Sequence, residues 1–159
     1  MSQHKAEVFT LQDLNALLSP VSGARSAGRI SWTLKKPRCL IGVLAVRTSF
    51  DGPVASALQM YIKPPSPSTP ELQYMVRGIP VRRCDVNGNH RKVKFTTHKH
   101  TYEPTTGAEG FYVPDDIPHL PHGATVAQGL YRAVFAAFAA ECYVELESGY
   151  WQEPPAGAR

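Results

Sequence analysis

The sequence predicts an α+β domain: a largely antiparallel sheet of five or six strands with a short N-terminal helix and a longer C-terminal helix packed on it. Three observations lead to this prediction. Apolar residues recur at helical spacing near both ends of the chain, they alternate with polar residues across its middle, and turn signals separate the alternating runs. With 159 residues, of which 43% are hydrophobic, the chain suits one hydrophobic core. We expect one domain over residues 8–147 and a flexible tail over residues 148–159, where a Pro-Pro-Ala-Gly run offers little to pack.

The N-terminal helix is predicted to begin after Thr10. Thr10 and Asp13 have the spacing of a capping box, in which each side chain accepts a hydrogen bond from the backbone of the other. The leucines that follow share one helical face, and Pro20 ends the helix after about two turns. Residues 21–28 have the composition of a loop.

Period-two alternation and short apolar runs predict the strands. Several proline-rich or glycine-rich segments interrupt them, and Asn87-Gly88 is a strong hairpin signal. One long strand is expected to carry a bulge or edge position near residues 78–80. The predicted strands cover residues 30–35, 39–46, 58–62, 72–85, 91–102 and 111–113.

The C-terminal helix is predicted from a second capping box and an apolar stripe. Thr125 and Gln128 have the capping-box spacing. Apolar residues then recur every four positions, so we expect this stripe to lie on one face of the sheet. The stripe consists of Val126, Leu130, Val134, Phe138 and Cys142, flanked by Ala127, Tyr131 and Phe135.

Composition excludes several classes of protein. No apolar run approaches the roughly 20 residues that span a bilayer, and the first residues lack the apolar core of a secretory signal. Three cysteines without a C-x-x-C pair predict free thiols in a reducing compartment. We therefore expect a cytoplasmic protein that does not associate with membranes.

The charge of the chain is unevenly distributed. The formal net charge is only +4, yet residues 77–100 hold seven basic side chains and one acidic one. Residues 103–159 hold two basic and eight acidic side chains. A basic hairpin attracts phosphates, although lysine and arginine also serve to keep a sheet edge soluble.

Three residues of the predicted hairpin are candidate catalytic groups: His98, His100 and Tyr102. Alternate residues of a strand share a face, roughly 6.5–7 Å apart, which suits two imidazoles on either side of a phosphodiester. Histidine serves as acid or base near neutral pH, and arginine or lysine stabilises charge on the phosphate. The expected nucleic-acid or partner-binding residues are Arg82, Arg83, His90, Arg91, Lys92 and Lys94.

No metal or other cofactor is predicted. His98-x-His100 and His119-x-x-His122 supply imidazoles at spacings that a metal ion could use. However, no carboxylate or cysteine stands at an obvious ligand spacing, and the neighbouring lysines repel cations. Nucleotide-binding loops and the serine-hydrolase motif are missing from the sequence.

The hairpin resembles a family of small prokaryotic proteins that includes TumE-type toxins of toxin–antitoxin pairs and related phage- or island-borne domains. The resemblance is carried by an R-x-D…G…H…H-x-H-x-Y pattern within residues 83–102, and the predicted order of elements agrees with it. It implies a role linked to mobile elements or defence, with nuclease-like toxicity. Arg91, Lys92 and Lys94 depart from the pattern, because glycine, proline and polar residues are common at those positions.

Three functions remain open from the sequence. The first is a toxin-like ribonuclease with His98 and His100 as its acid and base. The second is a binding protein without catalysis, such as a phage- or island-encoded inhibitor of a host defence complex. The third is a structural domain whose arginine–Asp85 contacts only fix the hairpin. The expected partner is RNA, an antitoxin or a host defence complex, and a dimer is compatible with the sequence.

Overall fold

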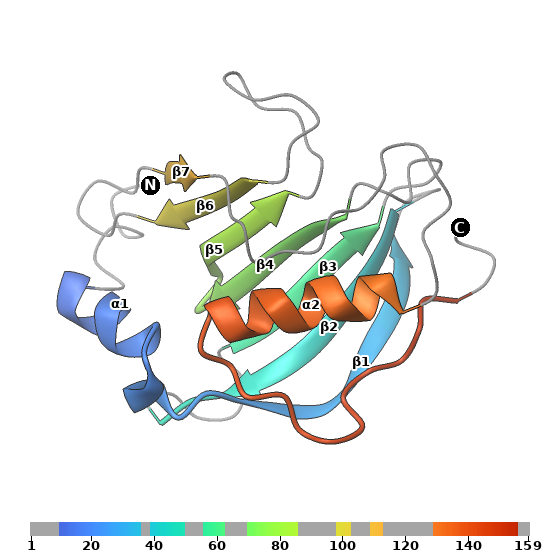
Figure 1. The fold of residues 1–159 in the computed structure, drawn as a ribbon, viewed down its shortest axis with the longest axis horizontal. Coiled ribbons are helices and arrows are strands. Elements are labelled where there is room, and N and C mark those ends of the chain that lie inside the picture. Colours follow the sequence, from blue (N-terminus) through green and yellow to red (C-terminus); the bar gives the residue numbers. More distant parts are fainter. Residues whose placement is uncertain are drawn as a thin grey trace.

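A computed structural model describes residues 10–35, 39–49, 56–62, 70–85, 98–102, 109–112 and 129–155. In the described part of the chain, one sheet holds seven strands in chain order, and all neighbours are antiparallel (Figure 1). The helices are α1 (Leu11–Leu17), the 3-10 helix η2 (Pro20–Ser22) and α2 (Leu130–Glu141). The strands are β1 (Arg25–Lys35), β2 (Cys39–Arg47), β3 (Ser56–Ile62), β4 (Glu71–Val76), β5 (Ile79–Asp85), β6 (His98–Tyr102) and β7 (Glu109–Tyr112).

The predicted α+β class, with its short N-terminal helix and longer C-terminal helix, is confirmed. The strands β1 to β5 form the bulk of the described sheet, and the short strands β6 and β7 bring it to seven, above the expected five or six. One added strand comes from the segment 72–85, predicted as a single interrupted strand. It is a hairpin instead: β4 and β5 pair across a two-residue turn at Arg77 and Gly78.

Backbone geometry explains that turn. Arg77 has φ +52° and Gly78 has φ +77°, and a type I′ turn needs positive φ at both central residues. Glycine adopts this conformation freely, whereas arginine does so at a cost. The arginine is the reason why the turn signal is weak in the sequence.

The N-terminal helix has the predicted capping box. The Thr10 hydroxyl accepts a hydrogen bond from the backbone N–H of Asp13 at 3.0 Å, and the Asp13 carboxylate accepts one from the backbone N–H of Thr10 at 3.2 Å. Leu14 and Leu17 are buried in the core. Strand β1 begins at Arg25, within the segment expected to be a loop, because residues 25–27 pair with the end of β2; Glu145 adds an isolated parallel bridge to Arg25.

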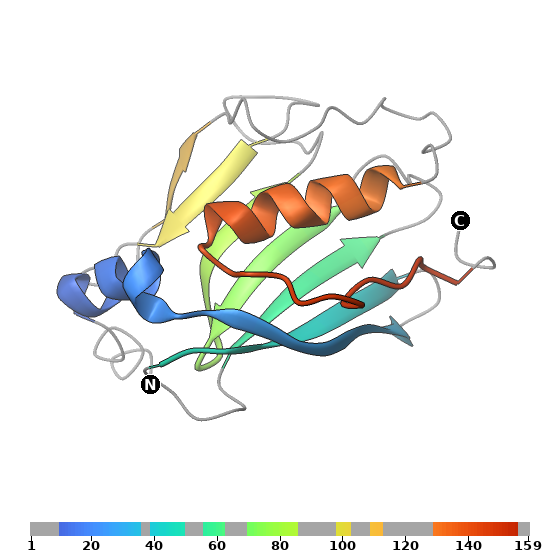
Figure 2. The ribbon, with the colours of Figure 1, turned by 60° about the horizontal axis from the view of Figure 1, so that its bottom comes forward.

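The core lies between α2 and one face of the sheet (Figures 1 and 2). Helix α2 buries Tyr131, Val134, Phe135 and Phe138, as the stripe predicts. It begins after Gly129, while the predicted cap at residues 125 and 128 lies outside the described residues. The sheet contributes the alternate residues of its central strands: Leu40, Leu44, Val46, Leu58, Met60, Ile62, Leu72, Tyr74 and Val76. No helix of the described residues is long and apolar enough to cross a membrane.

Residues 144–153 form a C-terminal strap that runs along β1 (Figure 2). The backbone N–H of Ile30 donates to the carbonyl of Tyr150 at 2.7 Å, and the Trp32 indole N–H donates to the carbonyl of Gln152 at 2.8 Å. Tyr150 is only 7% exposed, and Trp151 stacks edge-on against Trp32 with ring centroids 6.0 Å apart. The flexible tail predicted from residue 148 is corrected in part, because Tyr150 and Pro154 are buried and Trp151 packs against the core, while the residues between them are exposed or half-buried.

Candidate nucleic-acid interface

The sheet has a second face, opposite α2, which we call the open face. Its residues alternate with the core residues along β2 to β5, and none of the described helices covers it (Figures 1 and 2). Its central side chains are mostly polar and half-buried, unlike the apolar core face. The open face is represented by Ile41, Val43, Gln59, Tyr61, Glu71, Gln73, Arg83 and Asp85.

Strand register arranges these side chains in two rows across the sheet. One row runs through Val43, Gln59, Gln73 and Arg83, and the other through Ile41, Tyr61, Glu71 and Asp85. Directly opposed residues of antiparallel strands have Cβ atoms about 4.5–5.5 Å apart, so neighbours in a row interact.

Arg83 joins the two rows through ion pairs. Its Nε lies 3.6 Å from Oε1 of Glu71, and its Nη2 lies 3.5 Å from Oδ2 of Asp85. The three side chains are 27%, 27% and 19% exposed, so solvent screens these pairs less than it screens fully exposed ones. Because two carboxylates face one guanidinium, the three groups together carry a net charge of −1, which weakens Arg83 as a ligand for phosphate.

Tyr61 lies beside this charged group. Its hydroxyl donates a hydrogen bond to Oε1 of Gln59 at 2.8 Å. Burial raises the pKa of Tyr61 above its ordinary value of 10.0, and the Glu71 carboxylate and the Cys39 thiol raise it further. Tyr61 is therefore a neutral hydrogen-bond donor at physiological pH.

The β5–β6 register brings the predicted histidines to these residues. His98 is the register partner of Asp85, and His100 is the register partner of Arg83. The extended backbone expected for His98, His100 and Tyr102 is confirmed, because all three lie on β6. On the far side of β6, His100 is paired with Phe111 of β7.

The two adjacent arginines of the predicted site lie on different faces. Arg82 is the register partner of Tyr74, a core residue, and its Nη1 donates to the carbonyl of Val81 at 2.8 Å. Adjacent residues of a strand point to opposite faces. The register shift between β4 and β5, which leaves Val81 without a partner, determines that Arg82 lies on the face of α2 and Arg83 on the open face. Cys84 is fully buried, so it is a core residue and not a nucleophile.

Four predicted binding residues, His90, Arg91, Lys92 and Lys94, lie outside the described residues, as does the Asn87-Gly88 turn. Gln59, Tyr61, Glu71 and Gln73 were not among the predicted site residues. Their alternation with core residues was visible, but their proximity to the histidines depends on the unrecognised turn between β4 and β5.

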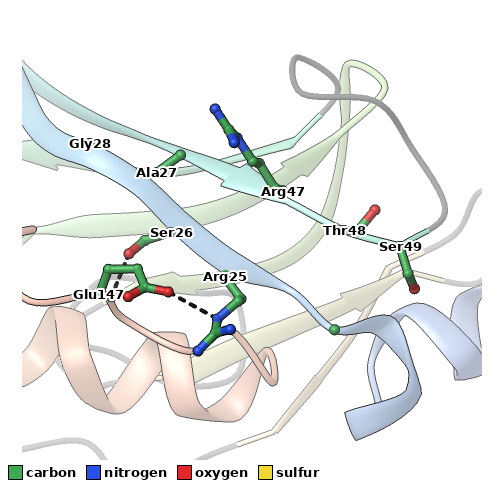
Figure 3. Close-up of a pocket in the computed structure, with 9 residues that line it drawn as sticks. Arg25, Ser26, Ala27, Gly28, Arg47, Thr48, Ser49 and Glu147 are labelled. Carbon is green, nitrogen blue, oxygen red and sulfur yellow. Dashed lines mark hydrogen bonds and ion pairs between the residues drawn. The ribbon is translucent and has the colours of Figure 1, made fainter.

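A separate pocket of about 520 Å³ lies at the opposite edge of the sheet from β6 (Figure 3). The start of β1, the end of β2 and Glu147 line it. Arg25 and Arg47 are register partners there, but their guanidinium groups extend away from each other (Figure 3). Arg25 is held by Glu145 at 3.1 Å and Glu147 at 2.9 Å. The pocket therefore presents one uncommitted arginine at most, and it is not joined to the histidines.

Comparisons with known proteins give no independent indication of function. No protein-family model, curated protein or solved structure matches this chain. Within the described residues, no group of three or more histidine, cysteine, aspartate or glutamate side chains is placed to hold a metal ion. The resemblance of residues 83–102 to TumE-type toxins thus depends on the sequence pattern alone.

Proposed function

We propose that this protein is a toxin-like ribonuclease that cleaves single-stranded RNA by acid–base catalysis on β5 and β6. His98 and His100 are the proton-transfer pair in this proposal. Asp85 orients His98, and Arg83 places positive charge beside His100. Tyr102 and the basic residues 90–94 contribute further contacts to the RNA.

The reaction requires two proton transfers. One histidine takes the proton of the ribose 2′-hydroxyl, and the 2′-oxygen attacks phosphorus. The bond between phosphorus and the 5′-oxygen breaks, and the second histidine, as its imidazolium, protonates that leaving oxygen. The products are a 2′,3′-cyclic phosphate and a 5′-hydroxyl, and cations stabilise the negative charge that develops on the phosphate.

The observation that supports this proposal is the β5–β6 register. A carboxylate beside a histidine favours its imidazolium form, and a guanidinium beside a histidine favours its neutral form. With His98 opposite Asp85 and His100 opposite Arg83, the residues directly opposite the two histidines carry charges of opposite sign. Opposite charges at the two positions would allow one histidine to be protonated and the other neutral at the same pH, as an acid–base pair requires. His98 is accordingly the acid and His100 the base.

A cytoplasmic site of action is part of the proposal. All three cysteines are free thiols, and two of them, Cys84 and Cys142, are fully buried. Free thiols persist in a reducing compartment, whereas an oxidising one favours disulfides.

The test is cleavage of a labelled single-stranded RNA by the full chain and by His98→Gln and His100→Gln. Each substitution removes a titrating group and should lower the rate by roughly 10²–10⁴-fold, the usual contribution of general acid–base catalysis. His122→Gln is the matched control and should cleave like the unmodified chain. Cleavage at the unmodified rate by both β6 variants would overturn the proposal.

A second candidate, a binding protein without catalysis, is favoured by one observation. Arg83 is already paired with two carboxylates, so the described part of the site is less basic than the sequence indicates. An antitoxin or a host defence complex would then be the partner. Under this function no RNA is cleaved, the β6 variants keep their partner, and charge reversal at Arg91 or Lys94 abolishes the complex.

A further inference from the structure

Two glutamines on the open face lie side by side and are each held at one end. Gln59 and Gln73 are direct register partners between β3 and β4. The Tyr61 hydroxyl donates to Oε1 of Gln59 at 2.8 Å, and Nε2 of Gln73 donates to Oε1 of Glu71 at 3.3 Å. In the part of the chain that the structure describes, neither amide makes another side-chain hydrogen bond. Both residues are half-buried, which restricts their rotation.

The partners determine which end of each amide remains available. An ionised carboxylate only accepts hydrogen bonds, so Glu71 fixes the NH₂ end of Gln73 and leaves its oxygen as an acceptor. Tyr61 keeps its proton well above neutral pH and donates it to the oxygen of Gln59, which leaves the NH₂ group of Gln59 as a donor. The two register positions thus offer the NH₂ group of Gln59 as a donor and the carbonyl oxygen of Gln73 as an acceptor next to each other.

We propose that Gln59 and Gln73 form a base-recognition subsite for single-stranded RNA, with the Tyr61 ring as a stacking surface. This inference rests on the proposed ribonuclease function and identifies residues that would recognise the bases of its RNA substrate. The Watson–Crick edge of a nucleobase carries a donor beside an acceptor, which complements the pair. Unstacked bases of single-stranded RNA are commonly read in this way, by aromatic stacking and by hydrogen bonds to their edges.

The position of the pair relative to the histidines supports RNA over other ligands with amide groups. Gln73, Arg83 and His100 follow one another in register across β4, β5 and β6. At about 4.8 Å between neighbouring strands, His100 lies roughly 10 Å from Gln73 along this row. A nucleotide next to the cleaved bond can therefore place its base at the glutamines. A single peptide group bound to the glutamines would not extend as far as the catalytic strand.

The test is equilibrium binding, so that it does not depend on cleavage. The full chain is titrated against four labelled oligoribonucleotides that differ in one base and carry a 2′-deoxy sugar at the cleavage position. The unmodified chain should prefer one base by about five-fold or more, as a pair of directed hydrogen bonds provides. Gln73→Met and Gln59→Met preserve side-chain length, remove the hydrogen bonds and should each reduce that preference several-fold.

Thr33→Val is the matched control, because Thr33 of β1 is exposed, is the register partner of the open-face residue Ile41 and lies outside the glutamine pair. It should leave the base preference unchanged. Equal affinity for all four RNAs, or an unchanged preference in both glutamine variants, would overturn the subsite. Base-selective binding by a chain that cleaves no RNA would instead refute the ribonuclease and retain the subsite. Thermal unfolding of each variant shows whether a loss of binding reflects a loss of the fold.

Discussion

Glu71 and Asp85 are direct register partners between β4 and β5, and the guanidinium of Arg83 lies 3.6 Å from the first carboxylate and 3.5 Å from the second. Like charges that stand directly opposite in a sheet destabilise it. Arg83 therefore stabilises this pairing, and with it the strand on which the proposed site is built.

Arg83→Met should destabilise the protein by about 1–3 kcal/mol, because two partly buried carboxylates would lose their common partner. Urea unfolding measures this difference. In a Glu71→Gln background the cost should be smaller, since only one carboxylate remains to be compensated. An equal cost in both backgrounds would contradict the role assigned to Arg83.

Tyr61 should make stability depend on pH in the alkaline range. The pKa of Tyr61 is raised in the folded protein above its ordinary value of 10.0, so folding favours the neutral phenol. Its contribution to stability is fully present below pH 10.0 and is lost as the pH rises through the folded pKa. The free energy of unfolding of the unmodified chain should therefore fall relative to that of Tyr61→Phe above this pH. Parallel pH profiles for the two proteins would contradict the direction of the shift.

Gly42 should not tolerate a methyl group. It is the register partner of Trp32, and a Cβ built on Gly42 would lie 2.8 Å from Cδ1 of Ile30 and 2.8 Å from Cζ3 of Trp32. Gly42→Ala should cost about 1–3 kcal/mol by overpacking, measured by chemical denaturation. The cost should shrink in a Trp32→Leu background, because the smaller side chain frees space, and strict additivity of the two changes would argue against the contact.

Phe138 of α2 should be essential for the core. Its side chain is 1% exposed, and Phe138→Ala should lower the free energy of unfolding by about 3–5 kcal/mol. Leu11→Ala is the control, because Leu11 is 55% exposed on α1 and should change stability by less than about 0.5 kcal/mol. Equal melting temperatures for Phe138→Ala and the unmodified chain would exclude the packing described for α2.

The sequence predicts the elements of this fold better than their relations. Alternation along β3 and the stripe of α2 are local patterns, and each reflects burial of one face of one element. Register is a relation between strands, and a one-residue change reverses which face a side chain occupies. The shift at Val81 therefore determines that Arg83, and not Arg82, reaches the open face, although both belong to one basic segment of the sequence.

The same limit applies to the candidate site. His98 and His100 are recognisable from their chemistry and spacing, and the backbone of β6 agrees with that prediction. Glu71 and the glutamines come close to the histidines only because the chain turns at Arg77 and Gly78. Arginine rarely adopts positive φ, so the sequence gives little sign of that turn. The sequence also does not show which residues Tyr150 and Trp151 pack against, because Trp32 and Phe135 belong to other elements and local patterns do not connect them.

The C-terminal strap has a consequence for the order of synthesis. Each hairpin of the sheet joins neighbouring segments and can form as the chain emerges, since such local pairings close short loops. On the side away from β2, the backbone N–H groups of Ser26 and Ile30 donate to the carbonyls of Glu145 and Tyr150, which are synthesised long after β1. A nascent chain therefore presents β1 as an unprotected edge throughout translation, and edges of that kind recruit other strands. A chain arrested before the strap is made should therefore expose this edge and aggregate more readily than the full chain.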